Sequence, residues 1–450
     1  MPIEILYLVA LLVAIVLVFV VFKRPIYEAM FIGYIVMIAI TGHWSEFFTH
    51  LFSTSTNTLF YAIVAFLAVA QIFGHTRVID DCINIILAIF GRFRGGAGYV
   101  ALIGSTFMGA LSGSGAGNVA ATGVFTIPAM KKSGFPAHLA ANIEMSASTM
   151  GNMIPPAGVI TAAFGVLGAL YPDRYTMSQF WLLMWGISIW FIIQRAITLY
   201  AFCRYYKVQP MVPEDIPKLG ESLKKGWRAL LLPVIIFLPF FLDAQLKATF
   251  FTAQLGKGAS NLSSCILLFT PGLAALYALL IGRKNSETSP KAIATMFAGQ
   301  VKSIVPVCAT IFFAYSISNL FNVLDFGTNI GNFISDWGLP LWVLAFFIPL
   351  FCALLGMVLP GSSQTAIFGG AIVAIMAGAG ANPFLIAGML PVITAMEGMT
   401  PPLALCMYTA MGIAGSGMKE TTKNCLVWVG LHYALSVIVM LGILPIWGLV

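Results

Sequence analysis

Residues 109–118, with the sequence GALSGSGAGN, place a turn rich in glycine and serine in the middle of an apolar segment. This segment, 92–132, opens with two arginines and closes with two lysines. Because basic residues favour the cytoplasmic face of a membrane protein, both ends are expected on that face. Irregular backbone at membrane depth is tolerated only where protein buries it or where it lines a water-filled cavity. The stretch therefore predicts a re-entrant helical hairpin whose turn lies at 112–118.

The next apolar element, 136–168, is interrupted near its middle by the sequence MIPPAG at 153–158. Two consecutive prolines, Pro155 and Pro156, remove two backbone donors, and their rings clash with the preceding helical turn. The helix must stop and restart at this point. The sequence therefore predicts a broken helix at about mid-depth in the membrane.

Both features recur in the second half of the chain. A hairpin is predicted at about 340–376, interrupted at 356–365 with the tip of its turn at 361–365, and a broken helix at 383–413, with its break at 397–402. The distance from turn to double proline is 42 residues in the first half and 40 in the second. The basic residues open the first hairpin to the cytoplasm and the second to the outside. This pattern predicts an inverted-topology repeat, whose interface near the bilayer midplane holds substrate and coupling ions.

The composition places all of this in a membrane. Of the 450 residues, 60% are hydrophobic and 9% charged, whereas soluble domains carry about 25% charged residues. A soluble enzyme, a fibrous protein and a disordered chain are excluded, and the lipid bilayer is the expected surrounding. We expect an all-α polytopic membrane protein with about 11 transmembrane spans and two re-entrant helical hairpins. The net charge of +7 comes largely from residues at the ends of apolar runs, so no nucleic-acid partner is predicted.

The basic residues also divide the chain. Residues 1–206 are expected to form the first repeat, 207–228 a cytoplasmic linker, and 229–450 the second repeat. Lys23 and Arg24 follow the first span directly, which predicts a multi-pass protein with its N-terminus outside.

The predicted chemistry follows from the broken helices. Helix ends leave carbonyl groups that attract cations and N–H groups that attract carboxylates. Hard cations such as Na⁺ suit neutral oxygen ligands, and no transition-metal site or catalytic residue is predicted. The first Na⁺ site is expected at Ser112, Gly113, Ser114, Asn118, Ile154 and Pro155, and the second at Gly361, Ser362, Ser363, Thr400 and Pro401. The substrate is expected between them, at Ser114, Asn118, Thr122, Gln364, Thr365 and Glu397.

At these same residues the sequence resembles the large membrane subunit of TRAP transporters (tripartite ATP-independent periplasmic transporters), the DctM-like proteins, and most of all their TAXI-type branch. The motifs that carry the resemblance lie at 109–135, 144–158 and 399–415. The resemblance implies an elevator-type permease of the ion transporter superfamily in the cell inner membrane. It implies import of an organic anion, usually a carboxylate, by symport with Na⁺. It also implies a small four-span membrane subunit, expected here as a separate chain, and an extracytoplasmic substrate-binding protein.

Some residues leave alternatives open. Glu144 and Glu397 lie in or near the broken elements, where the family tends to have neutral residues. They are expected either to take part in coupling or instead to cap half-helices or lie in water-filled vestibules. Arg195 is expected to extend its side chain to the cytoplasmic interface. A stand-alone ion-coupled anion transporter, a channel and an intramembrane serine protease using His432 are the alternative functions.

Overall fold

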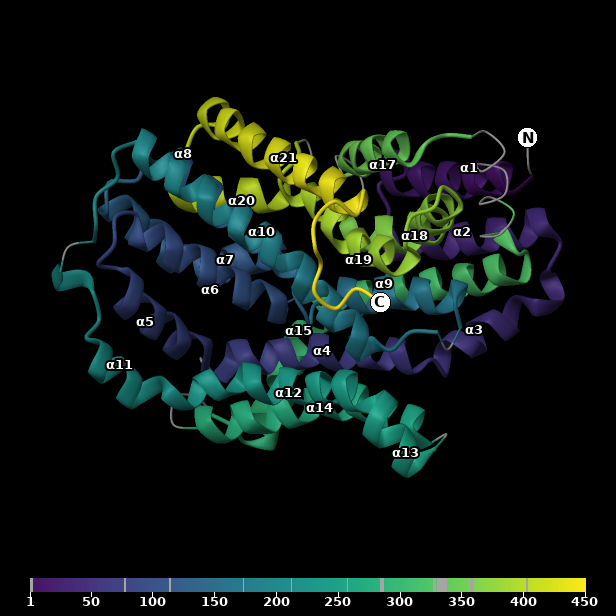
Figure 1. The fold of residues 1–450 in the computed structure, drawn as a ribbon, viewed down its shortest axis with the longest axis horizontal. Helices are drawn as coiled ribbons and strands as arrows, with labels where there is room; N and C mark the ends of the chain where they lie inside the picture. The colour runs from purple at the N-terminus through teal and green to yellow at the C-terminus, as the bar shows by residue number, and fades with distance from the viewer. Residues whose placement is uncertain are drawn as a thin grey trace.

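The computed structural model describes residues 3–450 apart from 77, 113–114, 173, 212, 257, 284–286, 327–328, 330–337, 357–359 and 402–403. These described residues are helical or irregular and contain no β-strand, which confirms the all-α prediction (Figure 1). Five helical stretches among them are long and apolar enough to cross a membrane, and shorter apolar helices accompany them. The count of about 11 spans stays a prediction.

Five α-helices begin the described part of the chain, and three of them pack against a helix from its second half. They are α1 (Ile3–Val16), α2 (Ile26–Thr41), α3 (Phe47–Ser55), α4 (Thr58–Thr76) and α5 (Val78–Phe90). Helices α2, α3 and α4 all contact the long helix α15 (Pro290–Val323). Helix α1 packs on α2, where a methyl group on Gly33 would lie only 2.9 Å from Leu11 Cδ1.

The first predicted hairpin corresponds to two helices that pack against each other, α6 (Gly96–Ser112) and α7 (Gly115–Lys132). Its turn is shorter than the predicted 112–118, because α7 already begins at Gly115. The Asn118 side chain explains this: its Nδ2 donates to the Ser105 carbonyl of α6 at 2.6 Å and so fastens the first turn of α7. Residues 113–114 lie outside the described residues.

The first broken element consists of α8 (Ala137–Met150), a 3₁₀ turn (Gly151–Met153) and α9 (Gly158–Leu170). The helix stops and restarts on either side of the double proline, at the place where proline chemistry requires it. Every residue from 139 to 150 is buried, so α8 is enclosed by other helices over most of its length.

The second hairpin and broken element show the same order. Helices α17 (Leu341–Leu355) and α18 (Gly361–Gly378) are followed by α19 (Pro383–Thr394), a 3₁₀ turn (Ala395–Gly398) and α20 (Leu405–Ala414). The Asn382 side chain caps α19 by accepting from the N–H groups of Phe384 and Leu385. The predicted turn at 361–365 is instead the first helical turn of α18.

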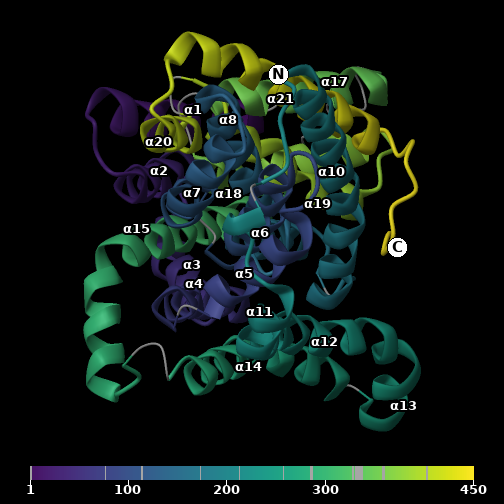
Figure 2. The ribbon, with the colours of Figure 1, turned by 90° about the vertical axis from the view of Figure 1, so that its left-hand side faces the viewer.

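The two halves are interleaved. Helix α7 packs against α8 and also against α20 of the second broken element, while α18 packs against α19 and also against α9 of the first. Each hairpin therefore covers one half of both broken helices. Figures 1 and 2 show α7, α8 and α20 on one side of the molecule.

Two long helices flank this centre, and a separate layer packs against α10 and α4. Helix α10 (Met177–Tyr205) contacts α8 and α19, and so does α21 (Met418–Met440). The separate layer, along one edge of Figures 1 and 2, contains α12 (Leu231–Leu246), α13 (Thr252–Leu255) and α14 (Gly258–Gly282). The predicted linker contains the short helix α11 (Leu219–Gly226), which packs on α5.

Candidate functional site

In the first half of the chain, the backbone of the hairpin lies directly against the backbone of the broken helix. A methyl group on Gly151, in the 3₁₀ turn, would lie 2.2 Å from the carbonyl carbon of Gly109 in α6. No side chain fits between these two segments. The interruption in the helix is thus held directly against the hairpin, which leaves no room for a residue larger than glycine.

The second half repeats this contact with different residues. A methyl group on Gly361, the first residue of α18, would lie 2.9 Å from the carbonyl oxygen of Thr394. A methyl group on Gly356 would lie 3.0 Å from the Cα atom of Glu397. The ends of the second hairpin therefore lie directly on the second break.

The two halves converge at Cys406, the second residue of α20. Its Sγ atom would lie 2.6 Å from a methyl group on Gly115, at the start of α7, and 2.7 Å from one on Gly398, in the second break. The same methyl group on Gly398 would lie 2.8 Å from Cγ2 of Thr149, at the end of α8. The tip of the first hairpin, the end of α8 and the second break thus meet around one buried sulfur.

Glu144 lies fully buried in α8, and four hydroxyl groups surround its carboxyl group. Its Oε1 accepts from Ser105 at 2.7 Å, from Thr122 at 2.6 Å and from Ser148 at 3.2 Å, and its Oε2 accepts from Thr126 at 2.6 Å. These donors come from α6, α7 and α8. A buried carboxyl group is costly unless such bonds satisfy it, so the cluster is a built polar site inside an apolar protein.

The hydroxyl groups have a second acceptor available. Thr122 also lies 2.8 Å from the carbonyl of Asn118, and Thr126 lies 3.1 Å from that of Thr122. Because a hydroxyl group has one hydrogen, each can donate either to Glu144 or to the helix backbone. The cluster can therefore adapt to a change at the carboxyl group by rotating hydroxyl groups alone.

Two amide oxygens near the breaks are buried and have no hydrogen-bond partner in the described part of the chain: Asn118 Oδ1 and Asn152 Oδ1. The Nδ2 group of Asn118 is fully used, since it donates to the Ser105 carbonyl and, at 2.9 Å, to Ser148 Oγ. Buried acceptors without a donor are costly. These oxygens lie where a cation or a donating ligand would satisfy them.

In the second half, Glu397 is half-buried in the 3₁₀ turn, and its carboxyl group accepts from the backbone N–H of Gly361. The first N–H groups of a helix have no partner within the helix, and negative groups are favoured there. Glu397 therefore lies at the amino terminus of α18, where it caps a half-helix, one of the roles predicted for it.

The remaining predicted site residues divide into three groups. Ile154, Gln364, Thr365 and Thr400 are buried at the breaks or at the start of α18, as is Pro155. Thr400 donates to the carbonyl of Met396, and Thr365 lies 3.5 Å from the Thr394 hydroxyl. Ser362 and Pro401 are half-buried, Ser112 is the last residue of α6, and Ser363 lies in the first turn of α18. Gly113 and Ser114 lie outside the described residues.

Arg195 contradicts the prediction that its side chain reaches the cytoplasmic interface. It is 1% exposed, and its Nε donates to the carbonyl of Ser146 in α8 at 3.1 Å. Its Nη2 lies 3.1 Å from Nδ1 of His432 in α21, and Nε2 of His432 lies 2.9 Å from the Val392 carbonyl in α19. The guanidinium group has two buried acceptors and also donates to the half-buried Gln194 Oε1 at 3.2 Å, so it has no need of the interface.

These contacts fix the form of the imidazole. A guanidinium group only donates, so Nδ1 of His432 accepts and Nε2 carries the hydrogen that it donates to Val392. The side chains of Arg195 and His432 thus link α8 and α19. They contact each of these helices a few residues before the helix breaks. His432 is occupied by this structural role, which leaves the protease alternative without its base.

The sequence alone did not indicate four members of this site: Ser105, Thr126, Ser148 and Cys406. A helical spacing could have indicated the hydroxyl cluster, since Asn118, Thr122 and Thr126 follow one another at intervals of four, as do Glu144 and Ser148. Ser105 comes from another helix, and only the fold brings it near.

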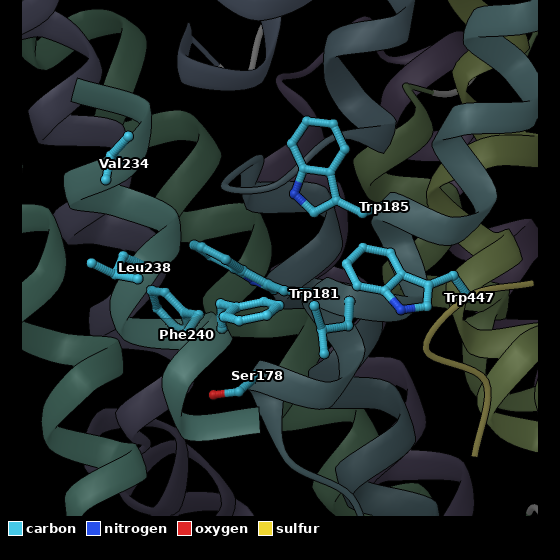
Figure 3. Close-up of a pocket in the computed structure, with 9 residues that line it drawn as sticks. Ser178, Trp181, Trp185, Val234, Leu238, Phe240 and Trp447 are labelled. Carbon is cyan, nitrogen blue, oxygen red and sulfur yellow. The ribbon is translucent and has the colours of Figure 1, made fainter. Parts of the chain in front are cut away.

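A pocket of about 370 Å³ lies elsewhere, between α10 and α12 (Figure 3). Its walls are mainly aromatic and aliphatic, and Trp181 and Phe240 stack there with ring centroids 3.7 Å apart. Ser178 supplies a hydroxyl group, which bonds to the buried Asp243. The hairpins and the breaks do not contribute to this lining.

Comparison with known proteins agrees with the geometry. Residues 6–445 match the sequence profile of the tripartite ATP-independent periplasmic transporter, DctM component. The chain is 23% identical over 390 residues to the C4-dicarboxylate TRAP transporter large permease protein DctM of Pseudomonas aeruginosa, which covers 86% of this chain and 85% of that protein. It is also 23% identical over 400 residues to the ectoine TRAP transporter large permease protein TeaC of Halomonas elongata, with 86% and 85% covered.

Solved structures show the same fold at low identity. MtrF of Neisseria gonorrhoeae, described among antimetabolite efflux pumps, superposes with a TM-score of 0.67 at 13% identity, over 90% of this chain and 85% of that one. The YdaH transporter of Alcanivorax borkumensis gives 0.59 at 16% identity, over 90% and 88%. The matched transporter family and the permease relatives confirm the prediction of a multi-pass membrane protein that is not an enzyme. The chain belongs to the DctM family, the large permease component of tripartite ATP-independent periplasmic transporters.

Proposed function

We propose that this chain imports an organic anion, a carboxylate, by Na⁺-coupled secondary active transport. Relatives named for C4-dicarboxylates, ectoine and 2,3-diketo-L-gulonate all handle organic acids. The observation that carries the proposal is the convergence at Cys406, where the first hairpin, the end of α8 and the second break meet. Inverted repeats with broken helices place their binding sites at such an interface.

The first Na⁺ site is proposed at Ser112, Gly113, Ser114, Asn118, Ile154 and Pro155. Support comes from the Asn118 oxygen, which is buried and has no partner among the described residues. Hard cations bind oxygen atoms of amides, hydroxyl groups and carbonyls. Glu144 lies one residue away in this network, because Ser148 bonds to both Asn118 and Glu144. We therefore assign Glu144 the role of counter-charge to the first cation.

The second Na⁺ site is proposed at Gly361, Ser362, Ser363, Thr400 and Pro401, around the start of α18. The close packing of Gly361 on Thr394 supports this site, because it places the Thr394 carbonyl group, at the break, beside the start of α18. The substrate is proposed to contact Ser114, Asn118, Gln364, Thr365 and Glu397. Thr122 also belongs to the predicted set of substrate contacts. Because its hydroxyl group donates to Glu144, we propose that it acts on the substrate only through that carboxyl group.

Transport is proposed to follow an elevator mechanism. The moving domain would contain both hairpins and both broken helices. We add α10 and α21 to it, because Arg195 and His432 bind them to α8 and α19. The scaffold would contain α1 to α4, α12, α14 and α15.

Two partners and a location complete the proposal. We propose a small four-span membrane subunit and an extracytoplasmic substrate-binding protein, with the complex in the cell inner membrane and the N-terminus outside. The isethionate relative, named permease protein DctMQ, is longer, since the match covers 84% of this chain but 56% of that protein. Extra length in that relative is what a second permease component in one polypeptide would add.

The proposal is tested by uptake into membrane vesicles from cells that express the chain with its proposed partners. We expect labelled aspartate or succinate to accumulate above its outside concentration when a Na⁺ gradient is imposed. Replacement of Na⁺ by K⁺ or choline should abolish accumulation. Equilibration without accumulation would indicate a channel instead, and full activity without the binding protein would indicate a stand-alone carrier.

A further inference from the structure

The charge at the centre of the molecule is one-sided. The centre contains two acidic residues: Glu397 precedes Gly398, whose added methyl group would lie 2.7 Å from Cys406 Sγ, and Glu144 lies in α8, whose last turn reaches the same methyl group through Thr149. The ion pairs within the described residues lie elsewhere, at Arg24–Glu28, Glu46–His50 and Lys218–Glu221. Within the described part of the chain, neither central carboxyl group has a cationic partner.

The one buried guanidinium group that the described residues place nearby is bonded to other partners. Arg195 bonds to Ser146, which follows Glu144 by two residues in α8. The Ser146 acceptor is a backbone carbonyl, and the bonds of Arg195 within the described residues reach neither Glu144 nor Glu397. The donors of Arg195 are directed to Ser146, His432 and the side chain of Gln194. Its charge therefore does not present a binding position for a carboxylate at the centre.

The natural anion position of the second hairpin is already filled. Helix α18 has 18 residues and its first N–H group, that of Gly361, donates to Glu397. A substrate carboxylate would have to displace this side chain to reach that N–H group. A carboxylate has about four acceptor positions, and Glu397 is half-buried rather than sealed, so positions remain on it for a ligand that donates.

The unsatisfied groups at the breaks agree with this. Asn118 Oδ1 and Asn152 Oδ1 are acceptors, their residues are 0% and 9% exposed, and neither oxygen has a partner among the described residues. Amide oxygens accept and do not donate. What this centre lacks is therefore positive charge and hydrogen-bond donors, whereas a second carboxylate would add to what it already holds in excess.

We propose that the preferred substrate carries an ammonium group beside its carboxylate, and that Glu397 binds this ammonium group. The inference rests on the proposed transport of organic acids and narrows it to amino-acid-like zwitterions over dicarboxylates. Sodium supplies positive charge for the substrate carboxylate, and Glu397 binds the substrate ammonium group. A hydrogen bond between charged groups contributes enough to change affinity roughly tenfold to a hundredfold.

The test compares ligands that differ by one amino group. Thermal unfolding of the purified full chain in saturating Na⁺ would be followed with aspartate against succinate, glutamate against glutarate, and β-alanine against propionate. We expect at least one amino compound to stabilise the wild type at roughly tenfold or lower concentration than its partner. The Glu397→Gln variant should lose this preference, because the amide has no charge to offer.

Asp243→Asn is the matched control, since Asp243 is also buried but bonds to Ser178 and Ser263, far from the breaks, in α10 and α14. It should keep the wild-type preference. Equal or tighter binding of the deaminated partner by the wild type would overturn the inference and leave organic-acid transport standing. Stabilisation by neither member of any pair would overturn both. The wild-type comparison decides the matter even if Glu397→Gln fails to fold.

Discussion

Two buried charged side chains, Glu144 within α8 and Arg195 packed against it, show how single residues are accommodated here. Glu144 is surrounded by hydroxyl donors on one face of α8, while Arg195 reaches a carbonyl on another. A buried charge is destabilising unless bonds or a partner ion compensate it. Each group is compensated by neutral dipoles, so neither depends on the other. The cluster around Glu144 is left available to respond to a bound cation.

The Arg195–His432 contact gives a prediction at this scale. Arg195→Met should lower the stability of the protein, because the Nδ1 atom of His432 and the Gln194 oxygen lose their donor. Each buried group left unsatisfied costs about 1–3 kcal/mol. His432→Gln should be milder than His432→Leu, since an amide can accept from Arg195 and donate to Val392. Thermal unfolding of purified variants measures both effects.

Arg174→Met is the control for this prediction. Arg174 is exposed and lies over the rings of Tyr171 and Tyr175 at 5.8 and 5.3 Å from their centroids. Its loss should change the unfolding temperature little. If Arg195→Met were as stable as Arg174→Met, the link between α8 and α19 would have no energetic weight.

At the scale of single residues, the sequence predicted which polar residues belong to the site better than it predicted the groups to which they bond. Asn118 and Glu397 could be selected because polar groups in broken membrane helices are unusual. The role of Arg195 could not be predicted, because its acceptors are a carbonyl and an imidazole from helices 49 and 237 positions away. Cys406 gave no signal at all, since its importance is one of position.

At the scale of elements, the breaks were the most predictable feature. A double proline must interrupt a helix, and α8 and α9 indeed end and begin on either side of Pro155. The predicted hairpin turns are longer than the observed ones, because a sequence rich in glycine predicts a turn even where the residues are helical. In α7, Gly115 and Gly117 are helical, and Gly115 is small because the Cys406 sulfur lies against it. Glycine here serves close packing rather than turning.

This reading of the glycines predicts the effect of adding one methyl group. Gly151→Ala should destabilise the protein by about 1–3 kcal/mol, because the methyl group would overlap the backbone of Gly109. Gly168→Ala in α9 should be neutral or stabilising by about 0.5–1 kcal/mol, because nothing lies within 4 Å of the added group. Unfolding curves of the two variants give the comparison. Equal stability would mean that the contact can yield without cost.

For the whole molecule, the crossing of the halves is the feature that matters most. Composition predicted a membrane protein and spacing predicted a repeat, but neither could show that α7 packs on α20 or α18 on α9. Those contacts join residues hundreds of positions apart. They tie the two hairpins and the two broken helices into a single body, so that both breaks would move together.

A crosslink tests the proposed movement. A methyl group on Gly165 of α9 would lie 2.3 Å from the Tyr315 hydroxyl of α15, across the proposed boundary with the scaffold. A Gly165→Cys and Tyr315→Cys pair, bridged by a short bifunctional reagent in a background without the native cysteines, should stop uptake reversibly. The pair Gly33→Cys and Leu11→Cys joins α1 to α2 inside the scaffold and should not. Uptake that survives the first bridge would contradict an elevator.

The most direct test of the account is binding of ²²Na⁺ to the purified chain, because it needs no knowledge of the substrate. The account predicts saturable binding to the wild type that K⁺ does not displace, and a half-saturation concentration raised at least roughly tenfold in Asn118→Leu, which removes the unpartnered oxygen. Asn382→Leu, at the start of α19, should bind as the wild type does. Unchanged ²²Na⁺ binding in Asn118→Leu, or none in the wild type, would contradict a cation site at the first hairpin and break.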